Sequence, residues 1–366
     1  MKKIISIALA LLMVAVMLPV MAMADETTTL QDQINAANEG DTIKLDKDYT
    51  EDIVINKKLT IDLNNHKLTN KADDTITVNA NGNLTITGNG TVDNVTHGRA
   101  AIFNNGTVTL NGGTYTRSAE VGTGKDPNSD NGNSWYTICN HGVMTVNAGA
   151  TVKNKGTFSS VFENGYYSYT KNAEREGYVE GTNNAAPKLT INGGTFEGGK
   201  ITIKNDDGGI LEINNGTFTN AWNRVVYNVN VATINGGSFS CPASNEIAVD
   251  SDKFNDTVNK GVMTITGGTF DGKVTKSNGT VTVSGGTFKK GVDESYIVDG
   301  KKLDANGNVV PESITIIVPS DGGNTTTTPS TDNTKNPSTG ANDFVGVAAA
   351  LAVVSLLGAA AVIRKK

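Results

Sequence analysis

The chain repeats a unit of eight residues, and this repeat constrains the possible folds more than any other feature of the sequence. Its fullest form is Leu189-Thr-Ile-Asn-Gly-Gly-Thr-Phe196, in which apolar residues alternate with polar ones on both sides of a glycine pair. Alternation with a period of two is typical of a strand with one buried face, and paired glycines permit the positive φ of a sharp corner. Each unit therefore predicts a strand, a corner and a second strand.

Seven further copies of the unit occur, five of them close and two looser. When the last apolar residue before each corner is the marker, from Ile86 to Val283, the successive intervals are 24, 36, 45, 22, 21, 31 and 18 residues. The short intervals indicate one structural turn each, and the long ones indicate a turn that carries an insertion. The further copies lie at 84–92, 108–115, 144–152, 211–218, 232–239, 263–270 and 281–288.

A third strand precedes several of the units and ends in asparagine, as in Ala101-Ile-Phe-Asn104. Three short strands in about 22 residues are too little chain for a stable sheet, but stacked coils bury a shared core. We therefore predict an all-β fold, a parallel β-helix of about nine coils within residues 25–310. The terminal asparagines would share one corner and hydrogen-bond along the stack, a structural role that we prefer to a chemical one. They are Asn104, Asn140, Asn205 and Asn228.

Residues 1–24 have the parts of a secretory signal peptide, namely a basic start, an apolar run and the ending Ala22-Met23-Ala24. A signal anchor is the alternative. Just beyond this segment, Leu30, Ile34 and Ala37 recur at helical spacing. They predict a short amphipathic helix that caps the first coil.

Three segments that follow the signal peptide have a distinctive sequence. They are Leu30-Gln-Asp-Gln-Ile-Asn-Ala-Ala37, Gly40-Asp-Thr-Ile-Lys-Leu45 and Leu59-Thr-Ile-Asp-Leu-Asn-Asn-His-Lys-Leu68. These segments resemble the opening of secreted pectin-lyase-like β-helix proteins, in particular the cell-surface forms of Gram-positive bacteria. The resemblance extends over roughly residues 27–310 and implies a right-handed parallel β-helix. It implies no single activity, because this superfamily includes lyases, hydrolases and proteins without known catalysis.

After Phe288 the repeat stops, and the rest of the chain divides into three parts. Residues 296–310 predict a hairpin that closes the last coil. Residues 311–335 contain many Thr, Ser and Pro residues and predict an extended spacer. Residues 336–366 hold a pentapeptide, an apolar run at 344–363 and a basic end. Twenty apolar residues span about 30 Å of hydrocarbon, so this run predicts a transmembrane helix.

The pentapeptide and the apolar run together resemble a sortase cell-wall sorting signal, whose family motif is Leu-Pro-x-Thr-Gly. The pentapeptide is Asn336-Pro337-Ser338-Thr339-Gly340. The resemblance implies cleavage after Thr339, its attachment to peptidoglycan, and an extracellular, wall-anchored protein whose partners include sortase. Asn336 replaces the usual leucine, which leaves the sortase class open. A plain single-span membrane anchor is the alternative.

Three interruptions of the repeat, at 117–136, 157–187 and 241–260, all follow the same strand of a coil, so we expect them to emerge at one corner. The first two contain many aromatic residues, Phe158 and Phe162 among them, although the whole chain is only 6% aromatic. Loops on a rigid scaffold commonly hold binding residues, and aromatic rings stack on sugars. Packing of these rings against the helix is the alternative. The ligand-binding candidates are Trp135, Tyr136, Tyr166, Tyr167, Tyr169 and Tyr178.

Charge and cysteine content exclude several classes. Processing at both ends leaves 26 basic and 36 acidic residues, a net charge near −10, which argues against nucleic acid and, without a bridging cation, against polyanionic substrates. Cys139 and Cys241 lie about three coils apart, roughly 14 Å at sheet spacing, so we expect buried thiols and no disulfide. The three histidines lack metal-ligand spacing. We expect no metal and no cofactor, and a monomer.

The weak catalytic candidates are Asp206 and Asp207, beside the Asn205 corner, with Arg224 about one coil later. Glycoside hydrolysis needs two carboxylates about 5 to 10 Å apart, but aspartate is also a common corner residue, and we prefer that interpretation. The sequence thus favours a non-enzymatic adhesin that binds carbohydrate or a host surface protein. The alternative is a polysaccharide lyase or glycoside hydrolase, in which these residues would converge with Glu174 or Glu176 of an insertion.

Overall fold

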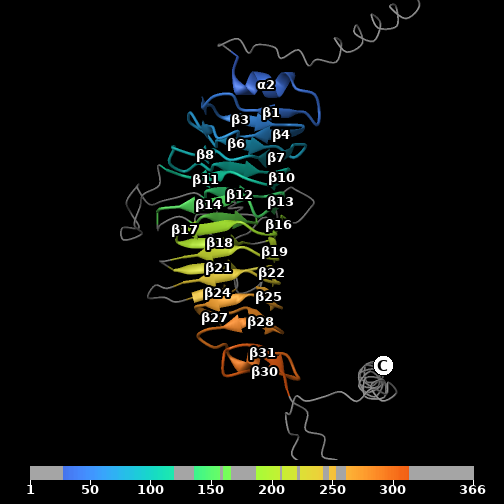
Figure 1. Cartoon of the computed structure of the whole chain (residues 1–366), viewed down its shortest axis with the longest axis vertical. Helices are drawn as coiled ribbons and strands as arrows, with labels where there is room; N and C mark the ends of the chain where they lie inside the picture. Colours follow the sequence, from blue (N-terminus) through green and yellow to red (C-terminus); the bar gives the residue numbers. More distant parts are fainter. Residues whose placement is uncertain are drawn as a thin grey trace, which may run out of the picture. The chain divides into compact units, whose positions relative to one another are not determined.

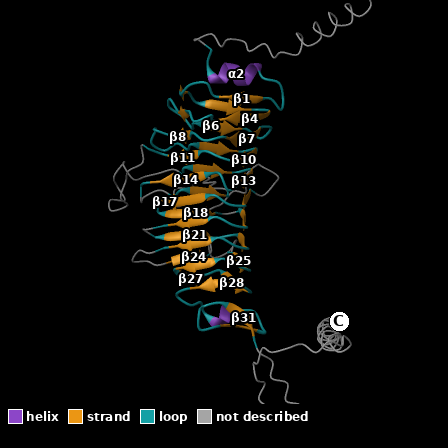
Figure 2. Ribbon diagram, in the orientation of Figure 1, coloured by secondary structure: helices purple, strands orange, loops and turns teal. Residues whose placement is uncertain are grey.

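The structure is a computed structural model that describes residues 28–118, 136–156, 160–165, 187–206, 208–220, 223–241, 247–252 and 261–312. All of them belong to one compact unit, Met1–Ser313. Within it, three parallel sheets run along a stack of coils, as Figures 1 and 2 show. Each coil contributes one strand to sheet A, then one to sheet B, then one to sheet C. This arrangement confirms the predicted parallel β-helix.

Sheets A and B have ten strands each and sheet C has nine, so the described residues form nine complete coils and a tenth that lacks a strand in sheet C. Sheet A consists of β1 (Thr42–Lys44), β4 (Lys58–Asp62), β7 (Asn83–Thr87), β10 (Thr107–Leu110), β13 (Val143–Val146), β16 (Lys188–Ile191), β19 (Ile210–Ile213), β22 (Val231–Ile234), β25 (Val262–Ile265) and β28 (Thr280–Val283). Sheet B consists of β2 (Tyr49–Thr50), β5 (Lys67–Thr69), β8 (Thr91–Asp93), β11 (Thr114–Thr116), β14 (Thr151–Asn154), β17 (Thr195–Gly198), β20 (Thr217–Thr219), β23 (Ser238–Ser240), β26 (Thr269–Asp271) and β29 (Thr287–Phe288). Sheet C consists of β3 (Ile53–Ile55), β6 (Ile76–Val78), β9 (Ile102–Asn104), β12 (Ile138–Asn140), β15 (Phe162–Asn164), β18 (Ile201–Asn205), β21 (Arg224–Asn228), β24 (Ile247–Ser251) and β27 (Lys273–Lys276).

The core lies inside the coils and consists of the apolar residues that alternate with polar ones along each strand. In sheet B, successive phenylalanine rings stack in register, with centroids 4.7–4.9 Å apart and planes within 8° of each other. This separation equals the spacing of neighbouring strands, about 4.8 Å, so the hydrogen-bonded ladder sets the ring spacing. The stacked rings are Phe196, Phe218, Phe239, Phe270 and Phe288.

Both ends of the stack are covered. At the N-terminal end, α2 (Leu30–Ala36) begins with a capping box formed by Thr29 and Asp32, and it buries Leu30 and Ile34 on the first coil. At the other end, the 3-10 helix η1 (Glu294–Tyr296) precedes the antiparallel pair β30 (Lys301–Leu303) and β31 (Val309–Pro311), in the region where the sequence predicts a hairpin. These caps leave neither terminal coil with a bare apolar end.

The connections between strands correct one prediction. The interruption at 157–187 contains β15, and the one at 241–260 contains β24, so both are split by a strand of sheet C. The three interruptions therefore do not emerge at one corner: extra residues lie both between sheets B and C and between sheets C and A. Phe162, counted among the insertion aromatics, is a fully buried core residue of β15.

Several predictions concern residues outside the described part of the chain. These are the signal peptide, the spacer, the sorting motif Asn336–Gly340 and the apolar run at 344–363. Among the described residues, no helix is both long and apolar enough to cross a membrane. Cys139 and Cys241 are both buried and neither forms a disulfide, as expected.

Candidate functional site

One outward-facing row of sheet A and one of sheet C differ sharply in residue type. In sheet A, one outer position is occupied by threonine in nine of ten strands, from Thr42 to Thr282, with Glu212 as the exception. In sheet C, the outer position lies between an inward apolar residue and the corner residue, because side chains alternate along a strand. We call these residues the outer row of sheet C. They are Val54, Thr77, Phe103, Cys139, Glu163, Lys204, Tyr227, Asp250 and Thr275.

Glu163 occupies the middle of the outer row and is almost completely buried. Its side chain is 1% exposed, and Oε2 lies 3.4 Å from Nε2 of His141, which follows β12. The ring of Phe103 meets the imidazole edge to face, with the centroids 5.0 Å apart. Burial raises the pKa of the Glu163 carboxyl, although His141 opposes the shift. This carboxyl group is therefore held in an environment that favours its protonated form.

One coil further along, Lys204 forms an ion pair with Asp206, whose side chain is 1% exposed. Lys204 Nζ also donates a hydrogen bond to Oη of Tyr136 at 3.2 Å and lies 5.8 Å from the centre of its ring. Burial alone would lower the pKa of the Lys204 ammonium, but Tyr136 and Asp206 outweigh it and hold that pKa well above its usual range. The Lys204 ammonium group therefore stays charged and remains bound to Asp206 and Tyr136.

A second ion pair lies in the following coils. Arg224 Nε donates to Oδ2 of Asp250 at 3.0 Å, and the Asp250 side chain is fully buried. The guanidinium also lies 5.2 Å from the ring centre of Tyr227, whose hydroxyl donates to Asp252 at 3.0 Å. Burial and then Asp252 raise the pKa of the Tyr227 hydroxyl, so it remains a neutral donor. The outer row thus combines aromatic rings with charges fixed by nearby partners.

The corner asparagines form a continuous ladder between sheets C and A. Asn104 donates to Asn140, Asn140 to Asn164, Asn164 to Asn205 and Asn205 to Asn228, at 2.7–2.8 Å. The ladder ends at the hydroxyl of Ser251, 3.2 Å from Asn228 Nδ2. All of these residues are buried. Asn164 was missed at the sequence level, although its strand ends in asparagine like four others in this sheet.

A second ladder, also missed, runs along the corner between sheets A and B. Here each side-chain amide donates to the preceding coil, at 2.7–3.0 Å, and the side chains are exposed or half-buried. The fourth residue of the repeated unit supplies most of them. They are Asn111, Asn147, Asn192, Asn214 and Asn235, with Thr266 as the last donor.

The predicted catalytic residues have separate partners. Asp206 pairs with Lys204, whereas Arg224 pairs with Asp250. Asp207, Glu174 and Glu176 lie outside the described residues. Among the binding candidates, Tyr136 is half-buried against Lys204. Trp135, Tyr166, Tyr167, Tyr169 and Tyr178 lie outside the described residues.

Sequence reasoning missed the part played by Glu163, Lys204, Tyr227 and Asp250. The information was present in the strand register, since each follows an inward apolar residue and precedes the corner residue. No group of three or more His, Cys, Asp or Glu side chains in the described ranges is placed to hold a metal ion.

The fold and this outer row define a parallel β-helix protein with aromatic and buried ionisable side chains in the outer row of one sheet. No family model matches the chain, and searches of curated proteins and of solved structures each found no match.

Proposed function

We propose that the chain is a cell-surface adhesin that binds carbohydrate, or a surface protein, through the outer face of sheet C. In this proposal, residues 1–24 direct secretion, the coils form a right-handed helix of the pectin-lyase-like kind, and sortase attaches Thr339 to peptidoglycan. The observation that supports the binding role is the contrast between sheets. Aromatic side chains and buried carboxyl groups lie together in the outer row of sheet C, whereas one outer row of sheet A is almost entirely threonine. Sheet A stacks its coils without such residues in that row, so the stacking of coils does not require them.

The pairing of charges on this face indicates what kind of glycan it would bind. Lys204 and Arg224 each contact a carboxylate that is at most 1% exposed, so their charges are already compensated within the protein. A polyanion would have to compete with these buried carboxylates. We therefore expect a neutral glycan, held by hydroxyl hydrogen bonds and by contact with the rings of Tyr136 and Tyr227.

A carbohydrate-active enzyme remains the second candidate, and one observation favours it. Glu163 and Asp206 are buried carboxyl groups in different environments, one near a histidine and one paired with a lysine. A pair of carboxyl groups whose environments differ is the usual basis of acid–base chemistry on sugars. In this alternative, Glu163 would donate the proton.

A binding screen separates these possibilities. The full chain is tested on immobilised neutral, uronate-containing and sulfated polysaccharides, and the supernatant is assayed for reducing and unsaturated sugar. We expect binding to a neutral glycan without turnover, at least tenfold weaker in Tyr227→Ala and unchanged in the sheet A control Thr145→Ala. Sugar release that is lost in Glu163→Gln would favour the enzyme. Equal binding by both alanine variants would reject the sheet C face.

Anchoring is tested separately. We expect Thr339→Ala to remove the chain from the wall fraction that survives boiling in detergent, because the acyl donor residue is gone. Retention of the variant in that fraction would reject sortase attachment. Ser338→Ala is the matched control, since this position is variable in the motif and its replacement should leave attachment intact.

A further inference from the structure

Glu163 is a buried carboxyl group with incomplete hydrogen bonding. Its Oε1 atom has no hydrogen-bond partner among the described residues, and its Oε2 atom faces His141 Nε2 at 3.4 Å. A buried carboxylate is strongly disfavoured unless its oxygens are paired, because it has lost its hydration. The protonated acid or an ion pair with imidazolium avoids this cost.

The other titratable groups that face Glu163 come from both neighbouring coils. Cys139 of β12 and Lys204 of β18 are its register partners in the neighbouring strands. The charge of Asp206 acts on the pKa of Glu163, and the charge of Glu163 acts on the pKa of Tyr136. Lys204 and Asp206 cancel each other as an ion pair. Burial raises the pKa of Cys139 and of Tyr136 well above their usual values, so both stay neutral. Of these groups, the Glu163 carboxyl is therefore the one that no fixed ion pair satisfies, and His141 Nε2, 3.4 Å from its Oε2, is placed to share a proton with it.

We propose that His141 and Glu163 hold one proton between them, and that loss of this proton to solvent weakens the coils formed by β12 and β15. With the proton, the pair is either an acid beside a neutral imidazole or a carboxylate beside an imidazolium, and its net charge is zero. Without the proton, it is a buried carboxylate with an unpaired oxygen. The middle of the stack is thus a pH-sensitive element, a property independent of any ligand.

The direction of the pH effect follows from the environment of Glu163. Burial raises the pKa of its carboxyl, so the folded chain binds the proton more tightly than the unfolded chain does. The resulting stabilisation is complete below about pH 4.3, the ordinary pKa of a glutamate side chain. It is lost as the pH rises through the pKa of the folded state. Acid therefore preserves these coils and alkali weakens them.

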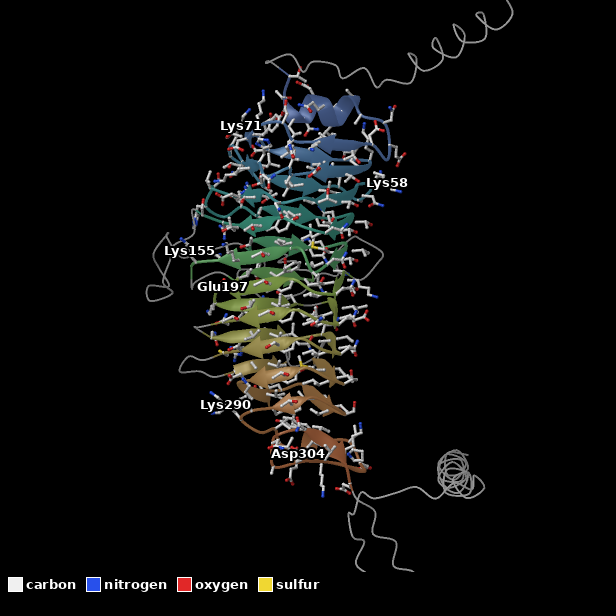
Figure 3. The ribbon with its side chains drawn as sticks, in the orientation of Figure 1. Lys58, Lys71, Lys155, Glu197, Lys290 and Asp304 are labelled. Atoms are coloured by element: carbon white, nitrogen blue, oxygen red, sulfur yellow. The ribbon has the colours of Figure 1, made fainter. Side chains whose placement is uncertain are left out.

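The first test compares stability across pH in the full chain, by urea unfolding between pH 4 and pH 9. We expect the unfolding midpoint of the wild type to fall toward alkaline pH relative to Glu163→Gln, which keeps the shape of the side chain and cannot ionise. The two midpoints should converge near pH 4.5. The matched control is Glu197→Gln, because Glu197 is an exposed glutamate on the outside of the stack, as Figure 3 shows. Its profile should follow that of the wild type.

The second test needs no destabilising change. Carbon NMR of the glutamate carboxyls and the histidine rings follows both groups, with Glu163→Gln and His141→Gln used for assignment. A shared proton requires the Glu163 carboxyl and the His141 ring to titrate with common midpoints. Hydrogen exchange, corrected for its intrinsic pH dependence, should rise in alkali at β12 and β15 in the wild type and not in Glu163→Gln. Independent titration of the two groups, or identical stability profiles for wild type and Glu163→Gln, would overturn the proposal.

Discussion

The two sides of this β-helix differ in how regularly their residues and connection lengths repeat from coil to coil. Sheets A and B and the corner between them repeat almost without change, with three or four residues in every connection. Around sheet C the connections vary widely: Gly272 alone links β26 to β27, whereas residues 117–137 link β11 to β12. The outer row of sheet C mixes aromatic and charged residues, whereas one outer row of sheet A is threonine in nine of ten strands. We call these parts the regular side and the variable side.

This difference shows which residues are needed to stack successive coils on one another. On the regular side, many coils place a ring on the ring of the preceding coil, an amide on its amide or a glycine at the corner, so each of these coils constrains the next. On the variable side, the inner apolar residues and the corner asparagines are constrained, but the outer row is not. Polar side chains there have become buried because they found partners such as Asp250 with Arg224. A residue that departs from the repeat, is buried and has a charged partner is therefore the first candidate for a functional role.

The largest expected effect comes from Asp250 on the variable side. Asp250→Ala removes the acceptor for Arg224 and for the hydroxyls of Thr275 and Ser277. Breaking a buried charge pair by removing one partner costs about 3–5 kcal/mol, and partial exposure of Arg224 favours the lower end. The control on the regular side is Thr264→Ala, which should stay within about 0.5 kcal/mol of the wild type. Urea unfolding measures both, and equal losses would remove the distinction between the two outer faces.

A smaller difference should separate the two asparagine ladders. Asn164→Ala leaves the side chains of Asn140 and Asn205 each without one buried partner, and an unsatisfied buried group costs about 1–3 kcal/mol. Asn192→Ala removes a similar link between Asn147 and Asn214, but water can replace it on the exposed ladder. We expect about 2–4 kcal/mol for the first and less than about 1 kcal/mol for the second. A loss at Asn192 as large as that at Asn164 would mean that exposure does not distinguish the ladders.

How much the sequence predicts also follows this division. Each regular coil can be recognised in the sequence, because its apolar, asparagine and glycine residues recur at fixed positions. The parallel β-helix was predicted from this recurrence. The strand β15 was not predicted, because the charged residue Glu163 occupies its outer position and because long connections precede and follow it. The expectation that the three insertions emerge at one corner was wrong for that reason.

The candidate site was less predictable than the fold. Asp206 and Arg224 were weak catalytic candidates in the sequence, but their partners, Lys204 and Asp250, come from the strand register and cannot be found from spacing along the chain. Likewise, His141 is one of three scattered histidines, and the sequence indicates no partner for it. It meets Glu163 only because β12 and β15 are neighbours in sheet C. Contacts between coils depend on the length of every intervening connection, and local patterns do not encode that length.

The smallest effect that we predict concerns a corner of the regular side. Gly194 has a φ of +101°, and a Cβ atom there would lie 2.8 Å from the carbonyl oxygen of Ala150. Gly194→Val should therefore cost about 1–3 kcal/mol through backbone strain, with the contact adding to it. Gly291 has a φ of +75° and nothing within 4 Å of its would-be Cβ, so Gly291→Val isolates the strain alone. Thermal melting followed by circular dichroism should show a lower melting temperature for Gly194→Val than for Gly291→Val. If the two variants melt alike, the close packing of successive corners contributes nothing, and the regular side owes its constancy to backbone conformation alone.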